Sequence, residues 1–261
     1  MHLIAHLTDL HLDLANKVEV DTATLIERTI EKVLALRQSP DCVVISGDLT
    51  ESGTVQEYER LRELLDRLPQ PVYLIPGNHD DRLMLRSVFA AYPGVALDPE
   101  FVMYAVDEGP LRLVMLDTVD PGRSEGALCP RRLAWLRETL AAEPNKPTLL
   151  IMHHPPIAIG IGGIDVLRLN AGADELQAIV ASHRNIERVL CGHYHRQTFA
   201  RWGGTVVSTG AAVARQLVLD LRADAEPHLT PEPPAFQIHA WLDDGTLVSH
   251  QVDVAGAQIR P

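Results

Sequence analysis

Five short polar clusters constrain the fold of this 261-residue chain most strongly, because each one directly follows an apolar run. Runs such as Cys42–Ile45 and Leu149–Met152 have the length and composition of buried strands. In α/β folds, ligands bind at the carboxyl ends of such strands. We therefore expect one site built from all five clusters, which read Asp9-Leu10-His11, Gly47-Asp48, Gly77-Asn78-His79-Asp80, His153-His154 and Gly192-His193-Tyr194-His195.

Strand and helix patterns alternate along most of the chain, which predicts an α/β core with helices outside. Asp21 or Thr22 is expected to cap the first helix. Further helices are expected over Val55–Leu68, Pro130–Ala142 and Asp174–His183. The expected strands are His2–Thr8, Asp41–Ser46, Val72–Ile75, Phe101–Val106, Leu111–Asp117, Thr148–Met152, Val189–Cys191 and Thr205–Ser208.

The C-terminal part of the sequence differs from the rest. Ala225–Pro234 contains four prolines and is interpreted as an extended linker or surface loop. Phe236–Leu242 and Leu247–Val252 flank an Asp-Asp-Gly turn, which predicts a β-hairpin. We expect a catalytic domain over 1–212 and an extension over 213–261. That extension packs either on the same domain or at the interface of a homo-oligomer, a dimer or larger.

Charge and composition exclude several classes of protein. The formal net charge is −12, and no cluster of Lys and Arg with interleaved aromatics is present. Binding to long nucleic acids or anionic membranes is therefore disfavoured. No apolar run has the length of a membrane span, and the N-terminus lacks a signal-peptide pattern, so we expect a cytoplasmic protein. Three cysteines at no metal-ligand spacing argue against a disulfide framework.

The donor atoms of the five clusters suit metal ions. Asp9 and His11 are two residues apart, so an extended segment would point both toward one ion. The donors are imidazoles, carboxylates and one amide, which favours Zn, Mn, Fe or Co over Mg or Ca alone. Two ions that share Asp48 account for all seven candidate ligands: Asp9, His11, Asp48, Asn78, His153, His193 and His195.

Charge counting indicates what such a site would bind. Asp9 and Asp48 would repel each other in an empty pocket, and two divalent ions reverse that repulsion. With a bridging hydroxide, the site would carry a net charge of about +1 and attract a phosphodiester monoanion. Two metals can hold both the attacking oxygen and a phosphoryl oxygen for in-line displacement.

The five motifs together, in this order, resemble those of the calcineurin-like metallophosphoesterases. The segments 74–81 and 152–156 are similar to the bacterial branch of class III cyclic-nucleotide phosphodiesterases and related glycerophosphodiesterases. This resemblance implies a four-layer α/β/β/α sandwich, here with a C-terminal β-hairpin extension. It also implies two divalent or mixed-valence transition metals and a metal-bridging hydroxide as nucleophile.

The resemblance further implies a role for each residue. Asp9, His11, Asp48 and His195 would hold the first metal, and Asp48, Asn78, His153 and His193 the second. His79 would contact the phosphoryl oxygen or assist the leaving alkoxide, and Asp80 would orient a neighbour. Asn78, His195 and His154 are candidate substrate contacts, and His154 is also an alternative ligand to His153.

One position departs from the wider family, where many members have Gly-Asp-x-x-Asp. Here Glu51 stands where the second acid would be, which puts its supporting role in question. The loops Leu14–Val18 and Pro156–Asn170 are expected to set specificity, and Gly160–Gly163 is interpreted as a flexible loop beside the site.

The sequence predicts hydrolysis of small phosphodiesters, with glycerophosphodiesters or a broad range of diesters favoured. A 3′,5′- or 2′,3′-cyclic nucleotide is the alternative substrate. A non-catalytic scaffold of the same fold and a nuclease are weaker hypotheses.

Overall fold

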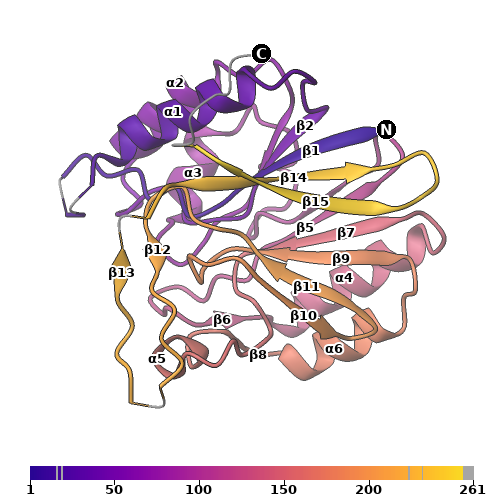
Figure 1. The fold of residues 1–261 in the computed structure, drawn as a ribbon. Helices are drawn as coiled ribbons and strands as arrows, with labels where there is room; N and C mark the ends of the chain where they lie inside the picture. The colour runs from indigo at the N-terminus through magenta and orange to yellow at the C-terminus, as the bar shows by residue number, and fades with distance from the viewer. Residues whose placement is uncertain (16, 19, 223, 231, 255–261) are drawn as a thin grey trace.

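Two β-sheets face each other in the computed structural model, and helices cover the outer side of each (Figure 1). The structure describes residues 1–15, 17–18, 20–222, 224–230 and 232–254. The helices are α1 (Thr22–Leu34), α2 (Val55–Leu65), α3 (Arg82–Val88), α4 (Pro130–Ala142), α5 (Gly162–Asp165) and α6 (Ala173–Ala181). The strands are β1 (His2–Leu7), β2 (Cys42–Ile45), β3 (Val72–Leu74), β4 (Tyr104–Val106), β5 (Arg112–Leu116), β6 (Gly126–Ala127), β7 (Thr148–Met152), β8 (Leu169–Ala171), β9 (Ile186–Cys191), β10 (Thr198–Trp202), β11 (Thr205–Thr209), β12 (Gln216–Leu217), β13 (Leu229–Thr230), β14 (Ala235–Trp241) and β15 (Leu247–Asp253).

Both large sheets are mixed, with the parallel pairs on one side of the first sheet and at the centre of the second. The first has the order β15-β14-β1-β2-β3, and the second has the order β10-β11-β9-β7-β5-β4. The pairs β1–β2, β2–β3, β5–β7 and β7–β9 are parallel, so their carboxyl ends lie at the same edge of their own sheet. Two short ribbons, β12–β13 and β6–β8, lie outside the two large sheets.

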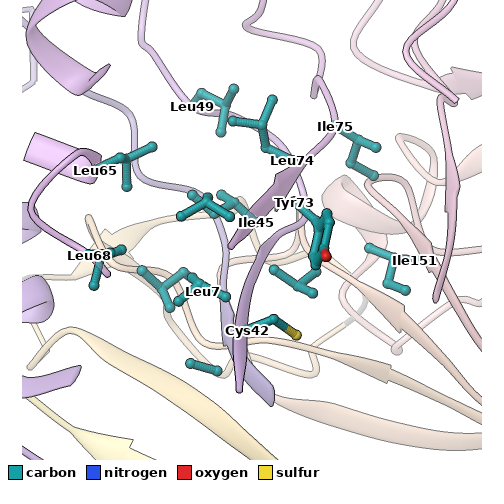
Figure 2. Close-up of a cluster of buried hydrophobic side chains, with 14 of the residues drawn as sticks. Leu7, Cys42, Ile45, Leu49, Leu65, Leu68, Tyr73, Leu74, Ile75 and Ile151 are labelled. Carbon is teal, nitrogen blue, oxygen red and sulfur yellow. The ribbon is translucent and has the colours of Figure 1, made fainter. Parts of the chain in front are cut away.

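Alternate residues of the central strands face different layers. In β5, Leu113 and Met115 pack in the cluster that includes the first sheet, whereas Val114 and Leu116 pack with residues of α4 and α6. Since side chains alternate across a strand, the second sheet is buried on both faces. Figure 2 shows Leu65 and Leu68 on one side of the strands of the first sheet and Ile151 of β7 on the other. These contacts confirm the predicted four-layer α/β/β/α sandwich.

The helices begin where their capping residues predict. The Asp21 carboxylate accepts a hydrogen bond from the Thr24 backbone N–H at the start of α1, as expected. Thr54 and Glu57 form a reciprocal capping box at the start of α2. Pro130 occupies the first turn of α4. None of the described helices is long and apolar enough to cross a membrane.

Several elements differ from expectation. The helix expected over Val55–Leu68 ends at Leu65, and β9 begins at Ile186 rather than Val189. β4 begins at Tyr104 rather than Phe101, because the Asp98 carboxylate accepts the Phe101 N–H and the Asp117 carboxylate accepts the Val102 N–H. Side chains therefore take the backbone donors that a strand would have used. The Ala225–Pro234 segment is not simply a linker, because Leu229 and Thr230 pair with β12. Pro231 lies outside the described residues.

The predicted C-terminal hairpin is present and extends the first sheet. β14 pairs antiparallel with both β15 and β1, so β1 lies between β14 and β2. Phe236 and Ile238 of β14 are buried in the same core cluster as the residues of β1. The boundary between 1–212 and 213–261 stays a prediction.

Phe236→Ala should lower the free energy of unfolding by about 3–5 kcal/mol, because it removes a fully buried aromatic ring. The matched control is Phe199→Ala, since Phe199 is 55% exposed on β10. Urea denaturation measures both variants. Equal, small effects would show that the hairpin contributes little to the core.

Candidate metal centre

The five polar clusters lie in the loops that directly follow five strands. β1, β2 and β3 of the first sheet precede three of them, and β7 and β9 of the second sheet precede the other two. The site is therefore at the edge where both sheets present carboxyl ends of parallel strands. All seven predicted ligands lie there: Asp9, His11, Asp48, Asn78, His153, His193 and His195.

Donor atoms from these loops gather in overlapping groups. Asp9, His11, Asp48 and His195 each place one donor atom within 4.8 Å of the others. A second group contains His153, His154 and His193, and a third contains His11, Glu51 and His79. The first group matches the residues expected at the first metal.

One carboxylate oxygen, Asp48 Oδ2, lies between two of these groups. It is 3.4 Å from His11 Nε2 and 3.3 Å from His153 Nε2. His153 Nε2 is also 3.2 Å from Asn78 Oδ1. Asp48 is therefore placed to serve both groups, and Asn78 joins the group around His153.

Each histidine ring is held by hydrogen bonds through the nitrogen that faces away from the donor cluster. The Nδ1 of His11 donates to Glu51 Oε2, and the Nδ1 of His153 donates to the Ser46 carbonyl. The Nδ1 of His195 donates to the Arg215 carbonyl. His193 differs, because its Nε2 donates to the Leu167 carbonyl. Such partners fix the tautomer and leave the opposite nitrogen as an electron-pair donor.

Glu51 thus has a defined place in the site. Its carboxylate lies 2.9 Å from His11 Nδ1, and its side chain is 18% exposed. From the position where the Gly-Asp-x-x-Asp pattern has its second aspartate, the Glu51 side chain reaches the ring of His11. Its interaction with His11 also lowers the pKa of Glu51 despite the opposing effect of burial.

The backbone at the ligands is not extended, contrary to the expectation for Asp9 and His11. Among the described residues other than glycine, five have positive φ: Asp9, His11, Asp48, His193 and His195. Every one of them is a predicted ligand. Non-glycine residues in this region carry local strain of about 1–3 kcal/mol each, which the surrounding structure must compensate. The side chains converge through this left-handed geometry instead of strand alternation.

Two glycines allow the loops to approach one another. A Cβ added at Gly77 would collide with the Asp48 carboxylate and the His153 ring. A Cβ added at Gly192 would collide with the Thr8 hydroxyl beside Asp9. These glycines are needed for close backbone approach at the predicted metal ligands.

The charges of the site favour ionised Asp48. Burial would raise the pKa of the Asp48 carboxyl, but the nearby rings of His153 and His11 hold it well below its usual range. Burial would likewise lower the pKa of His153, but Asp48 raises it to about 9. Burial and the neighbouring His153 lower the pKa of His193 to about 3. In the metal-free protein, His153 therefore carries the proton that neutralises Asp48.

His79 lies at the rim of the cluster, with its side chain 35% exposed. Its Nδ1 donates to the Glu51 carbonyl at 3.1 Å, so Nε2 is the nitrogen available to a substrate. The His79 backbone N–H donates to Asp48 Oδ1. His79 therefore sits beside the cluster without belonging to the two groups that share Asp48.

Asp80 connects two of the loops from beneath the site. Its carboxylate accepts hydrogen bonds from the backbone N–H groups of Leu49 and Gly77 and from the Tyr58 hydroxyl. Burial and the neighbouring Asp48 raise its pKa to about 6. These contacts place Asp80 as a positioning residue for the loop that carries Asp48.

His154 is completely buried behind His153 and His193. Its Nδ1 is 2.8 Å from the Thr118 hydroxyl, and its Nε2 has no hydrogen-bond partner among the described residues. Its ring centroid is 4.7 Å from that of His193. The side chain has no exposed surface through which to touch a substrate, whereas Asn78 and His195 line an open cavity.

That cavity has a volume of about 300 Å³ and also reaches residues that the sequence did not indicate. Its lining includes Leu217 of β12, Leu229 of β13 and Pro227 of the segment that connects them. The sequence did not indicate that the β12–β13 ribbon lines the cavity, because its strands are only two residues long and β13 lies within a proline-rich segment. The expected loop Pro156–Asn170 contributes Ile164 and Leu167, and part of it forms α5 rather than a flexible loop. Leu14–Val18 is not among the described lining residues, and Asn16 within it lies outside the described residues.

The arrangement of donor atoms fits bound cations. His11 Nε2 and His195 Nε2 are 3.0 Å apart, and both rings donate through Nδ1. In the neutral rings, two lone pairs therefore face each other beside the carboxylates of Asp9 and Asp48. A cation between them removes this repulsion, and a second cation beside His153 and His193 would give the unpartnered His154 Nε2 a nearby charge.

Fold and site together define a metallophosphoesterase, and residues 2–197 match the family described as Calcineurin-like phosphoesterase. The chain belongs to this family. It is 33% identical over 251 residues to a probable glycerophosphodiester phosphodiesterase GpdQ from Arcobacter nitrofigilis, covering 95% of this chain and 92% of that protein. It is 35% identical over 249 residues to a probable cyclic nucleotide phosphodiesterase from Synechococcus, covering 94% of each.

Solved structures show the same fold. A dimetal phosphatase from Danio rerio superposes with a TM-score of 0.70 and 15% sequence identity, covering 97% of this chain and 99% of that chain. At this level of identity the likeness supports the architecture alone.

Glu51→Ala should weaken metal binding about 10- to 100-fold, because it removes the carboxylate that orients His11. Competition with a chromophoric chelator measures this affinity. Glu63→Ala on α2 is the control, since the Glu63 side chain is 64% exposed. Equal affinities in both variants would contradict the orienting role.

Metal affinity should rise with pH up to about 9, because an incoming ion must displace the proton of His153. The pKa of this group is raised in the folded metal-free protein. Its ion pair with Asp48 therefore stabilises the fold fully below the ordinary histidine pKa of 6.5 and is lost as pH rises through about 9. Calorimetry with Mn²⁺ in two buffers of different ionisation enthalpy measures the released proton. Binding without proton release at neutral pH would contradict the assignment.

Proposed function

We propose that this chain is a metal-dependent phosphodiesterase that hydrolyses small phosphodiesters. The observation that carries the proposal is the shared position of Asp48 Oδ2 between His11 and His153, with His79 left beside the cavity. The names of the relatives support this chemistry, because the proteins from Arcobacter nitrofigilis and Synechococcus are both named as probable phosphodiesterases.

Asp9, His11, Asp48 and His195 would hold one metal, and Asp48, Asn78, His153 and His193 the other. Donor chemistry favours Mn, Fe, Zn or Co, in divalent or mixed-valence pairs. When bound, the ions supply positive charge for a phosphoryl oxygen and activate the attacking water.

The chain's own groups position the substrate and handle the proton. Nδ1 of His79 is committed to the Glu51 carbonyl, so Nε2 can donate to a phosphoryl or leaving oxygen when the ring is protonated. Asn78 and His195 line the cavity, which supports the proposal that they would touch the phosphoryl group. Asp80 holds the loops of Asp48 and Gly77 together and thereby fixes this geometry.

The relatives cover both substrate classes that the sequence suggested. One is a probable glycerophosphodiester phosphodiesterase, and the other is a probable cyclic nucleotide phosphodiesterase. A panel that compares glycerophosphoethanolamine with cyclic AMP tests them against each other. A non-catalytic scaffold is disfavoured because all seven predicted ligands and His79 are present.

Cellular and assembly properties stay predictions. The net charge of −12 argues against long nucleic acids as substrates, which a plasmid-degradation assay tests. We propose a cytoplasmic protein and a homo-oligomer, and we propose that residues 213–261 pack on the catalytic domain through β14. Light scattering measures the oligomeric state.

Removal of metal with a chelator should abolish hydrolysis of bis(p-nitrophenyl) phosphate, and Mn²⁺ or Co²⁺ should restore it. In the reloaded protein, His79→Ala should lower kcat about a hundredfold with unchanged metal content. His250→Ala on β15 is the control, because His250 is exposed. Full activity in the metal-free protein would refute the proposed function.

A further inference from the structure

The active-site cavity has one wall whose chemistry differs from that of the metal centre. Ile164 and Leu167 form part of this apolar wall, and Leu217, Pro227 and Leu229 form the rest. The two segments are far apart in sequence but adjacent in space, as Figure 1 shows for α5 and the β12–β13 ribbon. A Cβ added at Gly163 would meet the Pro227 ring, which confirms how closely they pack.

The apolar wall offers little to a hydrophilic group. Apart from Asp48 and the three histidines, the polar side chains that line the cavity are those of Asn78, Ser124 and Tyr194, and the side chains of the apolar wall itself contain no polar atom. The Tyr194 hydroxyl is already bonded to the Ile157 carbonyl. A glycerol or aminoalkyl arm placed against this wall would lose hydrogen bonds to water without replacement, whereas an apolar arm would gain by burial.

A second hollow of about 390 Å³ meets this cavity at Asn78 and His79, which line both. Asp81 and Arg82 border it, and each already has partners: Asp81 caps the Met84 N–H, and Arg82 pairs with Asp117. A phosphodiester has two ester arms that diverge from phosphorus. Asn78 and His79 line both hollows, so one arm could occupy each hollow and the apolar wall needs to accept only one arm.

We infer that the wall formed by Ile164, Leu167, Leu217, Pro227 and Leu229 binds an aromatic ester arm, such as a nucleobase or an aryl group. The inference rests on the proposed function and deepens it, since it assigns substrate preference to α5 and the β12–β13 ribbon. A cavity of about 300 Å³ is at the lower end of the range for small-molecule sites, which suits one ring system.

Binding of two phosphate monoesters to the metal-loaded protein tests the wall, because each monoester has a single arm. Phenyl phosphate should bind about tenfold more tightly than methyl phosphate, measured by calorimetry and by competitive inhibition. Leu229→Ala and Ile164→Ala should each reduce this preference several-fold while methyl phosphate binds as before. Leu219→Ala and Val166→Ala are the matched controls, because both side chains are exposed, neighbour the same segments and do not line the cavity.

The outcomes separate this inference from the proposed function. If the metal-loaded wild-type protein hydrolysed no phosphodiester, the proposed function itself would be wrong. If hydrolysis were normal but the wild type showed no preference for phenyl phosphate, the wall assignment alone would be wrong. Equal loss of phenyl and methyl phosphate binding in the wall variants would also overturn the wall assignment. That result would mean that the wall residues stabilise the site for any phosphate ester and do not contact the arm. Thermal unfolding of each variant confirms that it is folded.

Discussion

The Asp48 carboxylate is the constraint on which the site depends. Its Oδ2 lies within 3.4 Å of histidine nitrogens from both sheets, and its Oδ1 accepts the backbone N–H of His79. A buried carboxylate in this position is stable only with positive charge beside it. In the metal-free protein the His153 proton supplies part of that charge, and bound cations would supply more.

The sheets and loops around the site hold the Asp48 carboxylate between the two groups of donor atoms. Parallel strands of both sheets end at one edge, and β14 buries β1 inside the first sheet. Asp80 and Gly77 bring the loops after β2 and β3 into contact. The left-handed backbone at Asp9 and Asp48 is strained, and it persists because the sandwich on either side is closely packed.

The sequence predicted which residues gather at the site because each candidate ligand adjoins a recognisable buried strand. Local signals also identified the starts of α1 and α2 and the C-terminal hairpin, whereas α2 ends at Leu65 and not at the predicted Leu68. It could not predict the conformation at Asp9 and His11, because positive φ there is imposed by hydrogen bonds such as Asp9 N–H to the Gly47 carbonyl. The β12–β13 ribbon was missed for another reason. Its strands are two residues long and show no periodicity, so only the tertiary fold places Leu229 at the cavity.

The metal content of the purified protein tests the central claim most directly. Mass spectrometry of the metal-reloaded wild type should find two ions per chain. Asp48→Asn should lose both, because one carboxylate serves both groups of donors. If Asp48→Asn kept one tightly bound ion, or if the wild type held a single ion at saturation, Asp48 would not join the two groups into one site.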